Sequence, residues 1–129
     1  MRFWVSGGLV PEEQASVAVL DHGFTVGDGV FETLRTSTDP ELGVVPFALD
    51  RHLRRLARSA AGMGMAAPDP EQVRDALLAV CTANPELAAG GRLRVTYTAG
   101  AGPLGSERIE GAATLVVACS RAHPWPAAT

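Results

Sequence analysis

The chain has 129 residues, 47% of them hydrophobic and 19% charged, which is typical of a folded globular domain and not of a disordered segment. Its net charge is -3 and its pI is near 5.5. Since no long basic run stands out, we expect no nucleic-acid partner. No apolar stretch approaches the about 18 residues of a membrane span, and the first residues do not form a signal peptide. We therefore expect a cytoplasmic protein without a membrane partner.

The eleven basic residues are all arginine, so the chain contains no lysine. An arginine guanidinium stays protonated and cannot act as an amine nucleophile. Schiff-base chemistry from a side chain is therefore excluded within these residues. The two cysteines, Cys81 and Cys119, lie in apolar stretches without metal-ligand spacing, and we expect both to be buried free thiols.

Short apolar runs separated by polar, glycine and proline turns predict several strands in the first part of the chain. They lie at residues 3–5, 9–10, 17–20, 30–34 and 44–47.

Two helices are expected next, because apolar residues recur at helical spacing. Asp50 is the expected N-cap of the first helix, which ends near Gly62. The second helix begins with Asp69 as its cap and Pro70 as its first helical residue. It stops before the Asn84-Pro85 pair.

Two further strands follow these helices. Residues 92–98 alternate between apolar and polar side chains, as a strand covered on one face does. Residues 114–119 are almost continuously apolar, which is typical of a strand covered on both faces. Together these elements predict an α+β fold with five to seven strands and two helices on one face. Residues 1–122 are then one domain, and residues 123–129, which include His-Pro-Trp-Pro, begin an interdomain linker.

Three stretches resemble class IV (fold type IV) enzymes that use pyridoxal 5'-phosphate (PLP), namely aminotransferases and aminodeoxychorismate lyases. They are DHGFTVGDGVFETLR at 21–35, DRHLRRLARSA at 50–60 and GRLRVTYTAGAGPLG at 91–105. The order and spacing of these stretches match the amino-terminal domain of that family, from Phe3 to about Pro126.

The resemblance implies a mixed, mostly antiparallel sheet in a two-domain subunit, with the active site between the domains. It also implies PLP as cofactor, an amino-acid or amino-chorismate substrate, and a homodimer. The Schiff-base lysine of the family lies beyond its Pro-Trp-Pro-like linker. We therefore expect this chain to be the amino-terminal part of a longer enzyme, inactive alone. A natural stop after Thr129 would contradict that expectation.

The resemblance assigns the cofactor phosphate to Arg55, whose guanidinium fork can donate two parallel hydrogen bonds to phosphate oxygens. The alternative is that Arg51, Arg54, Arg55 and Arg58 form only the solvated face of a helix, and for the other three arginines we prefer that interpretation. His52 also matches the motif, but a packed, hydrogen-bonded histidine is the simpler reading.

On the substrate side the resemblance points to Phe31, Gly29 and Arg94. Arg94, on the polar side of its strand, would pair with a substrate carboxylate, and Arg92 shares that face as a weaker candidate. The alternatives are two edge arginines in water, and a turn followed by a core phenylalanine.

Two other kinds of site are disfavoured. The acidic residues and histidine between Asp21 and Glu32 fit no strong metal-ligand pattern. The glycine-rich segment 99–105 lacks the GxxxxGK[ST] sequence of a nucleotide loop, and the resemblance suggests a mobile loop near a neighbouring subunit's site. Val26 and Ala99 replace an aromatic residue and an arginine that many relatives carry, which leaves the substrate open.

The motif GDGVFET favours aminodeoxychorismate lyases and D-amino acid aminotransferases, with branched-chain aminotransferases as the alternative within the family. A stand-alone, non-catalytic ligand-binding or dimerisation domain is the alternative outside it.

Overall fold

In the computed structural model, which describes residues 1–122, the chain forms one six-stranded sheet with strand order β2-β1-β6-β5-β3-β4. Each pair of neighbouring strands is antiparallel. The strands are β1 Arg2–Val5, β2 Gly8–Pro11, β3 Gly29–Asp39, β4 Gly43–Pro46, β5 Gly91–Thr98 and β6 Thr114–Arg121. The predicted α+β fold with a mostly antiparallel sheet is confirmed. The expected linker lies at residues 123–129, outside the described residues.

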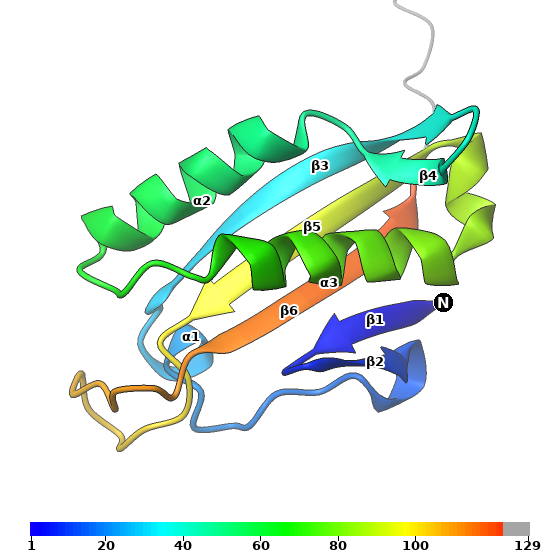
Figure 1. Cartoon of the computed structure of the whole chain (residues 1–129). Coiled ribbons are helices and arrows are strands. Elements are labelled where there is room, and N and C mark those ends of the chain that lie inside the picture. The colour runs from blue at the N-terminus through cyan, green and yellow to red at the C-terminus, as the bar shows by residue number, and fades with distance from the viewer. Residues whose placement is uncertain (123–129) are drawn as a thin grey trace, which may run out of the picture.

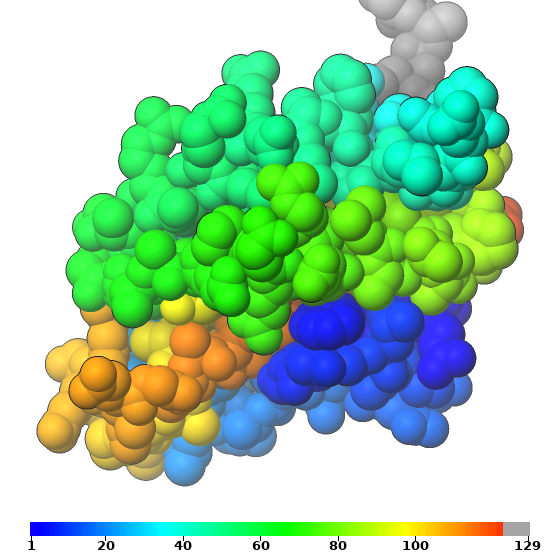
Figure 2. All heavy atoms as spheres, in the orientation of Figure 1, coloured from blue at the N-terminus to red at the C-terminus, as the bar shows by residue number. Residues whose placement is uncertain are grey.

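Two long helices, α2 Leu49–Gly62 and α3 Pro70–Ala83, lie on one face of this sheet (Figure 1). In the space-filling view they cover much of the sheet that Figure 1 shows behind them (Figure 2). The shorter elements are α1 His22–Thr25 and the 3-10 turns η1 Glu12–Gln14 and η2 Pro85–Ala89. The expectation of two helices on one face is therefore confirmed.

The core fills the space between the helices and the sheet. Leu56 of α2 and Leu77 of α3 are fully buried, as are Leu34, Leu93 and Val117 of the central strands. Burying a side chain of this size contributes about 1.5–3 kcal/mol to folding. The alternation predicted for residues 92–98 is confirmed, since Leu93, Val95 and Tyr97 are buried on the helix side.

The second face of the sheet carries neither of the two long helices in the described part of the chain, and only the short α1 lies beside it, at Thr98 of β5. We call it the open face. In β6, Leu115, Val117 and Cys119 are buried, whereas Val116 and Ala118 are only half-buried on the open face. The expectation that residues 114–119 are covered on both faces is thus not met by residues 1–122. Val116 and Ala118 thus give β6 an apolar side on the open face, and residues 1–122 cover it only in part.

The expected strand at residues 17–20 is wrong, because these residues form a loop and a turn. The side chains of Val17, Val19 and Leu20 are exposed. A strand needs a neighbouring edge to accept its backbone hydrogen bonds, and this segment instead leads directly into α1. A short apolar run alone does not provide such an edge.

The expected role of Asp50 is also wrong. Helix α2 begins at Leu49, and its N-cap is Ala48, a residue in the left-handed conformation without a capping side chain. Asp50 lies in the first turn, where a carboxylate is still favourable near the helix amino terminus, and it accepts a 2.7 Å hydrogen bond from Arg74 of α3. Asp69 is confirmed as the cap of α3, since its carboxylate accepts from the Glu71 backbone N–H at 3.0 Å.

Cys81 and Cys119 are buried free thiols, as expected. Burial raises the pKa of each thiol to about 11. Among the helices of residues 1–122, none has the length and hydropathy that crossing a bilayer requires.

Candidate functional site

Strand β3 sends alternate side chains to the two faces of the sheet, because successive residues of a strand point in opposite directions. Glu32 and Leu34 are buried on the helix side. Phe31, Thr33 and Arg35 are exposed on the open face. In this part of β3 the strand pairs with β5 on one edge, and β4 covers only residues 36–39 on the other edge. No strand therefore covers this edge of β3 at residues 29–35, and side chains from the two faces of the sheet can approach each other around it.

On the helix side, one buried carboxylate contacts two side chains of α2. His52 Nδ1 lies 2.7 Å from Glu32 Oε1 in a hydrogen bond, and Arg55 Nε lies 3.6 Å from the same oxygen. The Arg55 side chain is 51% exposed, whereas that of Glu32 is 7% exposed. The guanidinium is thus held at its inner end, while its outer nitrogens remain accessible. His52 is the packed, hydrogen-bonded residue that the sequence suggested.

On the open face, Phe31 and Arg94 form a cation–π contact, with the guanidinium carbon 3.8 Å from the ring centroid. Both residues line a cavity of about 390 Å³ with Gly29, Phe24 and Thr98. Phe31 is 52% exposed, so the alternative of a core phenylalanine does not hold. The structure brings together the three residues predicted for the substrate side, and it places Arg55 across β3 from them.

The turn before β3 has two glycines with different roles. Gly27 adopts a φ of +73°, which an L-residue rarely accepts. Gly29 has no such φ, but a Cβ there would lie 3.3 Å from Thr98 Cγ2 and 3.4 Å from the Tyr97 carbonyl oxygen. A side chain at position 29 would therefore fit tightly against β5, and glycine leaves the backbone here at the wall of the cavity.

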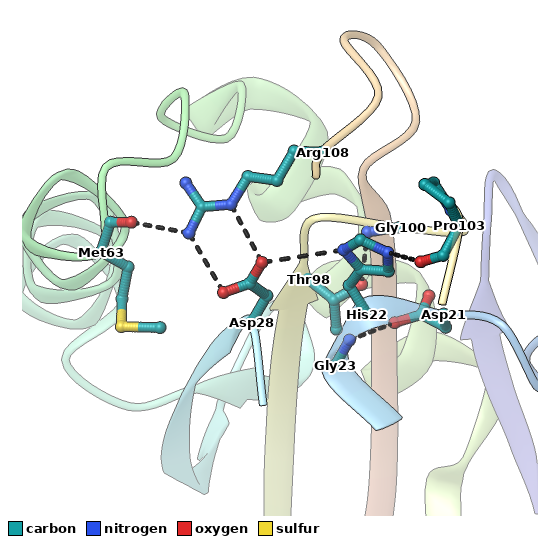
Figure 3. Close-up of polar contacts among 9 residues, drawn as sticks. All are labelled: Asp21, His22, Gly23, Asp28, Met63, Thr98, Gly100, Pro103 and Arg108. Carbon is teal, nitrogen blue, oxygen red and sulfur yellow. Dashed lines mark hydrogen bonds and ion pairs between the residues drawn. The ribbon is translucent and has the colours of Figure 1, made fainter. Parts of the chain in front are cut away.

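A clamp that the sequence did not predict joins this turn to two other segments (Figure 3). Arg108, in the loop between β5 and β6, donates to both carboxylate oxygens of Asp28 at 3.0 and 3.1 Å. The same guanidinium donates to the Met63 carbonyl oxygen at the end of α2, at 2.8 Å. Hydrogen bonding from Arg108 lowers the pKa of Asp28 below its usual range. Sequence spacing carries no signal for this contact, because the partners meet only through the strand order.

His22 fastens the first part of the same loop. Its Nε2 donates to the Pro103 carbonyl oxygen at 2.8 Å, and its Nδ1 lies 3.8 Å from Asp28 Oδ2 without a hydrogen bond (Figure 3). The neighbouring Asp21 caps α1 by accepting from the Gly23 N–H at 2.8 Å. Within residues 1–122, no three histidine, cysteine or acidic side chains are grouped so that they could hold a metal ion.

Solved structures with a similar fold include two aminotransferases. The branched-chain aminotransferase of the thermophilic archaeon Thermoproteus uzoniensis, solved with norvaline, matches with a TM-score of 0.76 and 29% identity over 94% of this chain. A hypothetical aminotransferase from Mycobacterium tuberculosis in a PLP-bound form matches with a TM-score of 0.76 and 27% identity, also over 94% of the chain. The chain covers 40% and 39% of these two proteins.

The family model described as Amino-transferase class IV matches residues 29–129, and the chain belongs to this family. Among curated relatives, a Methanocaldococcus jannaschii protein named as a branched-chain-amino-acid aminotransferase is 37% identical over 106 residues, which are 81% of this chain and 34% of the relative. The aminodeoxychorismate lyase of Bacillus subtilis is 41% identical over 56 residues, 43% of this chain and 17% of that protein. The chain thus spans about a third of the length of the Methanocaldococcus relative.

Proposed function

We propose that this chain is the amino-terminal part of a PLP-dependent class IV aminotransferase or aminodeoxychorismate lyase-like enzyme. The observation that carries the proposal is the arrangement around β3, with Arg55 held by Glu32 on one side and Phe31 stacked with Arg94 on the other. Family membership supports the same reaction class. Polypeptide beyond this segment would supply the lysine that these residues lack.

The donor groups of α2 fit the phosphate of PLP. Arg55 contacts Glu32 only through Nε, and its two terminal nitrogens have no hydrogen-bond partner among residues 1–122, so that they can donate to phosphate oxygens as a fork. Glu32 holds the inner end of this guanidinium and limits the directions in which it can point. In this proposal Arg55 binds the phosphate and Glu32 orients Arg55.

The open face fits an amino substrate that carries a carboxylate. The guanidinium carbon of Arg94 lies over the Phe31 ring, and this contact would help to orient the guanidinium for pairing with that carboxylate. Phe31 and the backbone at Gly29 would form the apolar wall of the pocket and exclude water from it. Bound PLP would supply the electron sink for charge that develops beside the substrate nitrogen.

The same proposal includes the polypeptide that covers the open face, the cellular location and the substrate classes of the enzyme. The apolar side chains left on the open face, such as Val116, support coverage by further polypeptide, either a second domain after residue 122 or a partner in a homodimer. Two buried free thiols are consistent with a reducing, cytoplasmic location. Amino acids and amino-chorismate compounds remain the two substrate classes, since relatives of both kinds match the chain.

PLP affinity of the full-length protein tests the assignment of Arg55. We expect Arg55→Gln to weaken binding about 10- to 100-fold, because hydrogen bonds to a charged group contribute about 1.5–3 kcal/mol. Arg54→Gln is the matched control, as it removes the same charge from an exposed position on the same helix. Absorbance titration with PLP measures both. An affinity for Arg55→Gln within twofold of the control would remove Arg55 from the site.

A comparison of the isolated chain with the full-length protein separates this proposal from a non-catalytic ligand-binding domain. The proposal expects no lysine-type adduct when the purified 129-residue chain is mixed with PLP and reduced with borohydride, since any adduct would map to the α-amine of Met1. A full-length protein that also forms no lysine adduct would favour the non-catalytic alternative.

A further inference from the structure

The backbone and the ring of His22 connect the turn before β3 to the loop between β5 and β6. Its backbone N–H donates to the Gly100 carbonyl oxygen at 2.8 Å, and its own carbonyl oxygen accepts from the Asp28 N–H at 3.0 Å. Its ring Nε2 lies 2.8 Å from the Pro103 carbonyl oxygen, and its Nδ1 lies 3.8 Å from Asp28 Oδ2 (Figure 3). Of these four polar atoms, only Nδ1 has no hydrogen-bond partner among residues 1–122.

The imidazole ring is enclosed by the same two segments. His22 is 1% exposed, although most of the loop beside it is exposed. A Cβ at Gly102 would lie 2.8 Å from Nε2, so the glycine backbone passes directly over the ring. Polypeptide beyond residue 122 could therefore reach Nδ1 only by displacing this loop.

Both ring nitrogens face oxygen atoms that accept hydrogen bonds. A neutral imidazole has one N–H and one lone pair. With the proton on Nε2, the lone pair of Nδ1 faces the Asp28 carboxylate. With the proton on Nδ1, the lone pair of Nε2 faces the Pro103 carbonyl oxygen at 2.8 Å. Only the imidazolium, which carries both protons, matches both oxygens.

The charges around the ring act in opposite directions. Asp28 favours the imidazolium, and its own pKa is lowered, first by the hydrogen bond from Arg108 and further by His22. Arg108 disfavours a second cation, because its Nε lies 3.0 Å from the same Asp28 oxygen, and burial also disfavours a charged ring. Of the other nearby acidic residues, Asp21 caps α1 and Glu107 is exposed on the loop. The charge of the ring therefore depends on the balance between Asp28 and Arg108.

These contacts do not suit His22 to act as a base on a substrate. Its Nε2 is occupied by the Pro103 carbonyl oxygen, and the ring is buried. Each of its polar atoms instead faces either the turn or the loop, so the contacts support a role in holding these two segments together.

We propose that His22 is a proton-operated latch, whose imidazolium holds the β5–β6 loop on the turn at Asp28 and whose deprotonation releases it. A proton taken up from solvent gives Nδ1 an N–H that donates to Asp28, while Nε2 keeps its hydrogen bond to the loop. Loss of that proton leaves a lone pair facing an oxygen, and the glycine-rich segment 99–105 is released. Since Asp28 directly precedes Gly29, the latch makes one wall of the Phe31 cavity sensitive to pH. The latch stands whether or not this cavity binds an amino substrate.

The test is ¹⁵N NMR of the histidine rings in the full-length protein at a series of pH values. The shifts of the two ring nitrogens distinguish the imidazolium from each neutral tautomer, and the His22 signals are those missing from His22→Gln. We expect the ring to lose its charge between about pH 5 and 8, where histidine side chains titrate. The heteronuclear NOE of the backbone amides in segment 99–105 should fall over the same pH interval.

His22→Gln is the variant without a switch. Its amide nitrogen can still donate to the Pro103 carbonyl oxygen, but it cannot change charge in this range. We therefore expect the NOE of segment 99–105 in this variant to stay constant from about pH 5 to 8.

Two further substitutions should move the charge transition of the ring in opposite directions. Arg108→Gln removes the cation that competes for the Asp28 carboxylate, so His22 should keep its proton to a higher pH. Asp28→Asn removes the carboxylate, so the ring should lose its proton at a lower pH. A purely structural clamp would not give opposite signs. Arg54→Gln, which removes the same charge from an exposed position on α2, should leave the transition where it is.

Three outcomes would overturn the inference. The first is a ring whose charge does not change between about pH 5 and 8, and the second is a change of charge that leaves the NOE of segment 99–105 unaltered. The third is a shift of the transition in the same direction by Arg108→Gln and Asp28→Asn. If Asp28→Asn fails to fold, Arg108→Gln and the unsubstituted protein still decide.

Discussion

The guanidinium of Arg94 stacks on the ring of Phe31, 3.8 Å from its centroid, although the two residues come from different strands and distant parts of the chain. They are diagonal neighbours across the pairing of β3 with β5, in which Phe31 faces Thr96 and Arg94 faces Thr33. Diagonal neighbours on one face of a sheet lie within reach of long and aromatic side chains. The stacking therefore follows from the register of these two strands.

Phe31→Leu should release Arg94 from this orientation, because leucine keeps apolar bulk but has no ring quadrupole. We expect a loss of about 0.5–1 kcal/mol in the free energy of unfolding, the value of an exposed cation–π pair, and a clear drop in the heteronuclear NOE of Arg94 Nε. Urea unfolding and ¹⁵N relaxation measure the two effects. An unchanged NOE would show that something other than the ring orients the guanidinium.

Glu32→Gln should loosen the contact between α2 and β3. The amide can still accept from His52, but the charge that attracts both His52 and Arg55 is lost, so we expect the free energy of unfolding to fall by about 1–2 kcal/mol. Glu41→Gln, at an exposed turn, serves as the control and should stay within about 0.5 kcal/mol. Equal effects of the two substitutions in urea unfolding would argue against the buried Glu32 contact.

The clamp between Asp28 and Arg108 should make stability depend on pH in the acid range. Since Arg108 lowers the pKa of Asp28 below its ordinary value of 3.8, the stabilisation is fully present above about pH 3.8 and is lost as the pH falls through the lower pKa of the folded state. Asp28→Asn should remove this dependence. Urea unfolding of both proteins at a series of pH values measures it.

Arg108→Gln provides the check on that interpretation. In its background, Asp28→Asn should alter the acid dependence much less, because the partner that shifts the pKa is already absent. A pH profile in which Asp28→Asn acts equally in both backgrounds would show that the clamp contributes nothing at this position.

Two glycine substitutions should act in opposite directions. Gly100 has a φ of +84°, and a Cβ there would collide with the Ala112 carbonyl group, so Gly100→Ala should cost at least about 2 kcal/mol. Gly62, at the end of α2, has open space around its Cβ position, and Gly62→Ala should be neutral or stabilise by up to about 1 kcal/mol. Thermal unfolding compares them, and a Gly100→Ala protein as stable as Gly62→Ala would contradict the predicted collision.

The buried thiols should resist modification in the folded chain. Burial raises the pKa of Cys81 and Cys119 from 9.0 to about 11, so little thiolate forms at about pH 8. We therefore expect a disulfide reagent to label these thiols only after the chain unfolds. This burial also implies stability that is present below about pH 9 and is lost as the pH rises towards about 11. Rapid labelling in this range without denaturant would show that one of the thiols is accessible.

The sequence alone determined the local elements whose signals are strong. Helix α3 begins at the predicted cap, Asp69, because a short acidic side chain followed by Pro70 satisfies the free backbone donors of a first turn. The alternation of residues 92–98 assigned the buried side of β5 correctly, since a strand in a two-layer fold exposes every second residue. The strand predicted at residues 17–20 was wrong, because this short apolar run resembles a strand but has no neighbouring strand edge to pair with.

Only the tertiary structure decided which of these residues meet. The placement of β5 between β3 and β6 sets Arg94 beside Phe31 and Arg35 opposite Arg92, and it carries Arg108 to Asp28. Such contacts depend on strand order and register, which are settled by burying the whole set of apolar faces at once and leave no local pattern in the chain. The absence of lysine, by contrast, is a property of composition that no fold can alter.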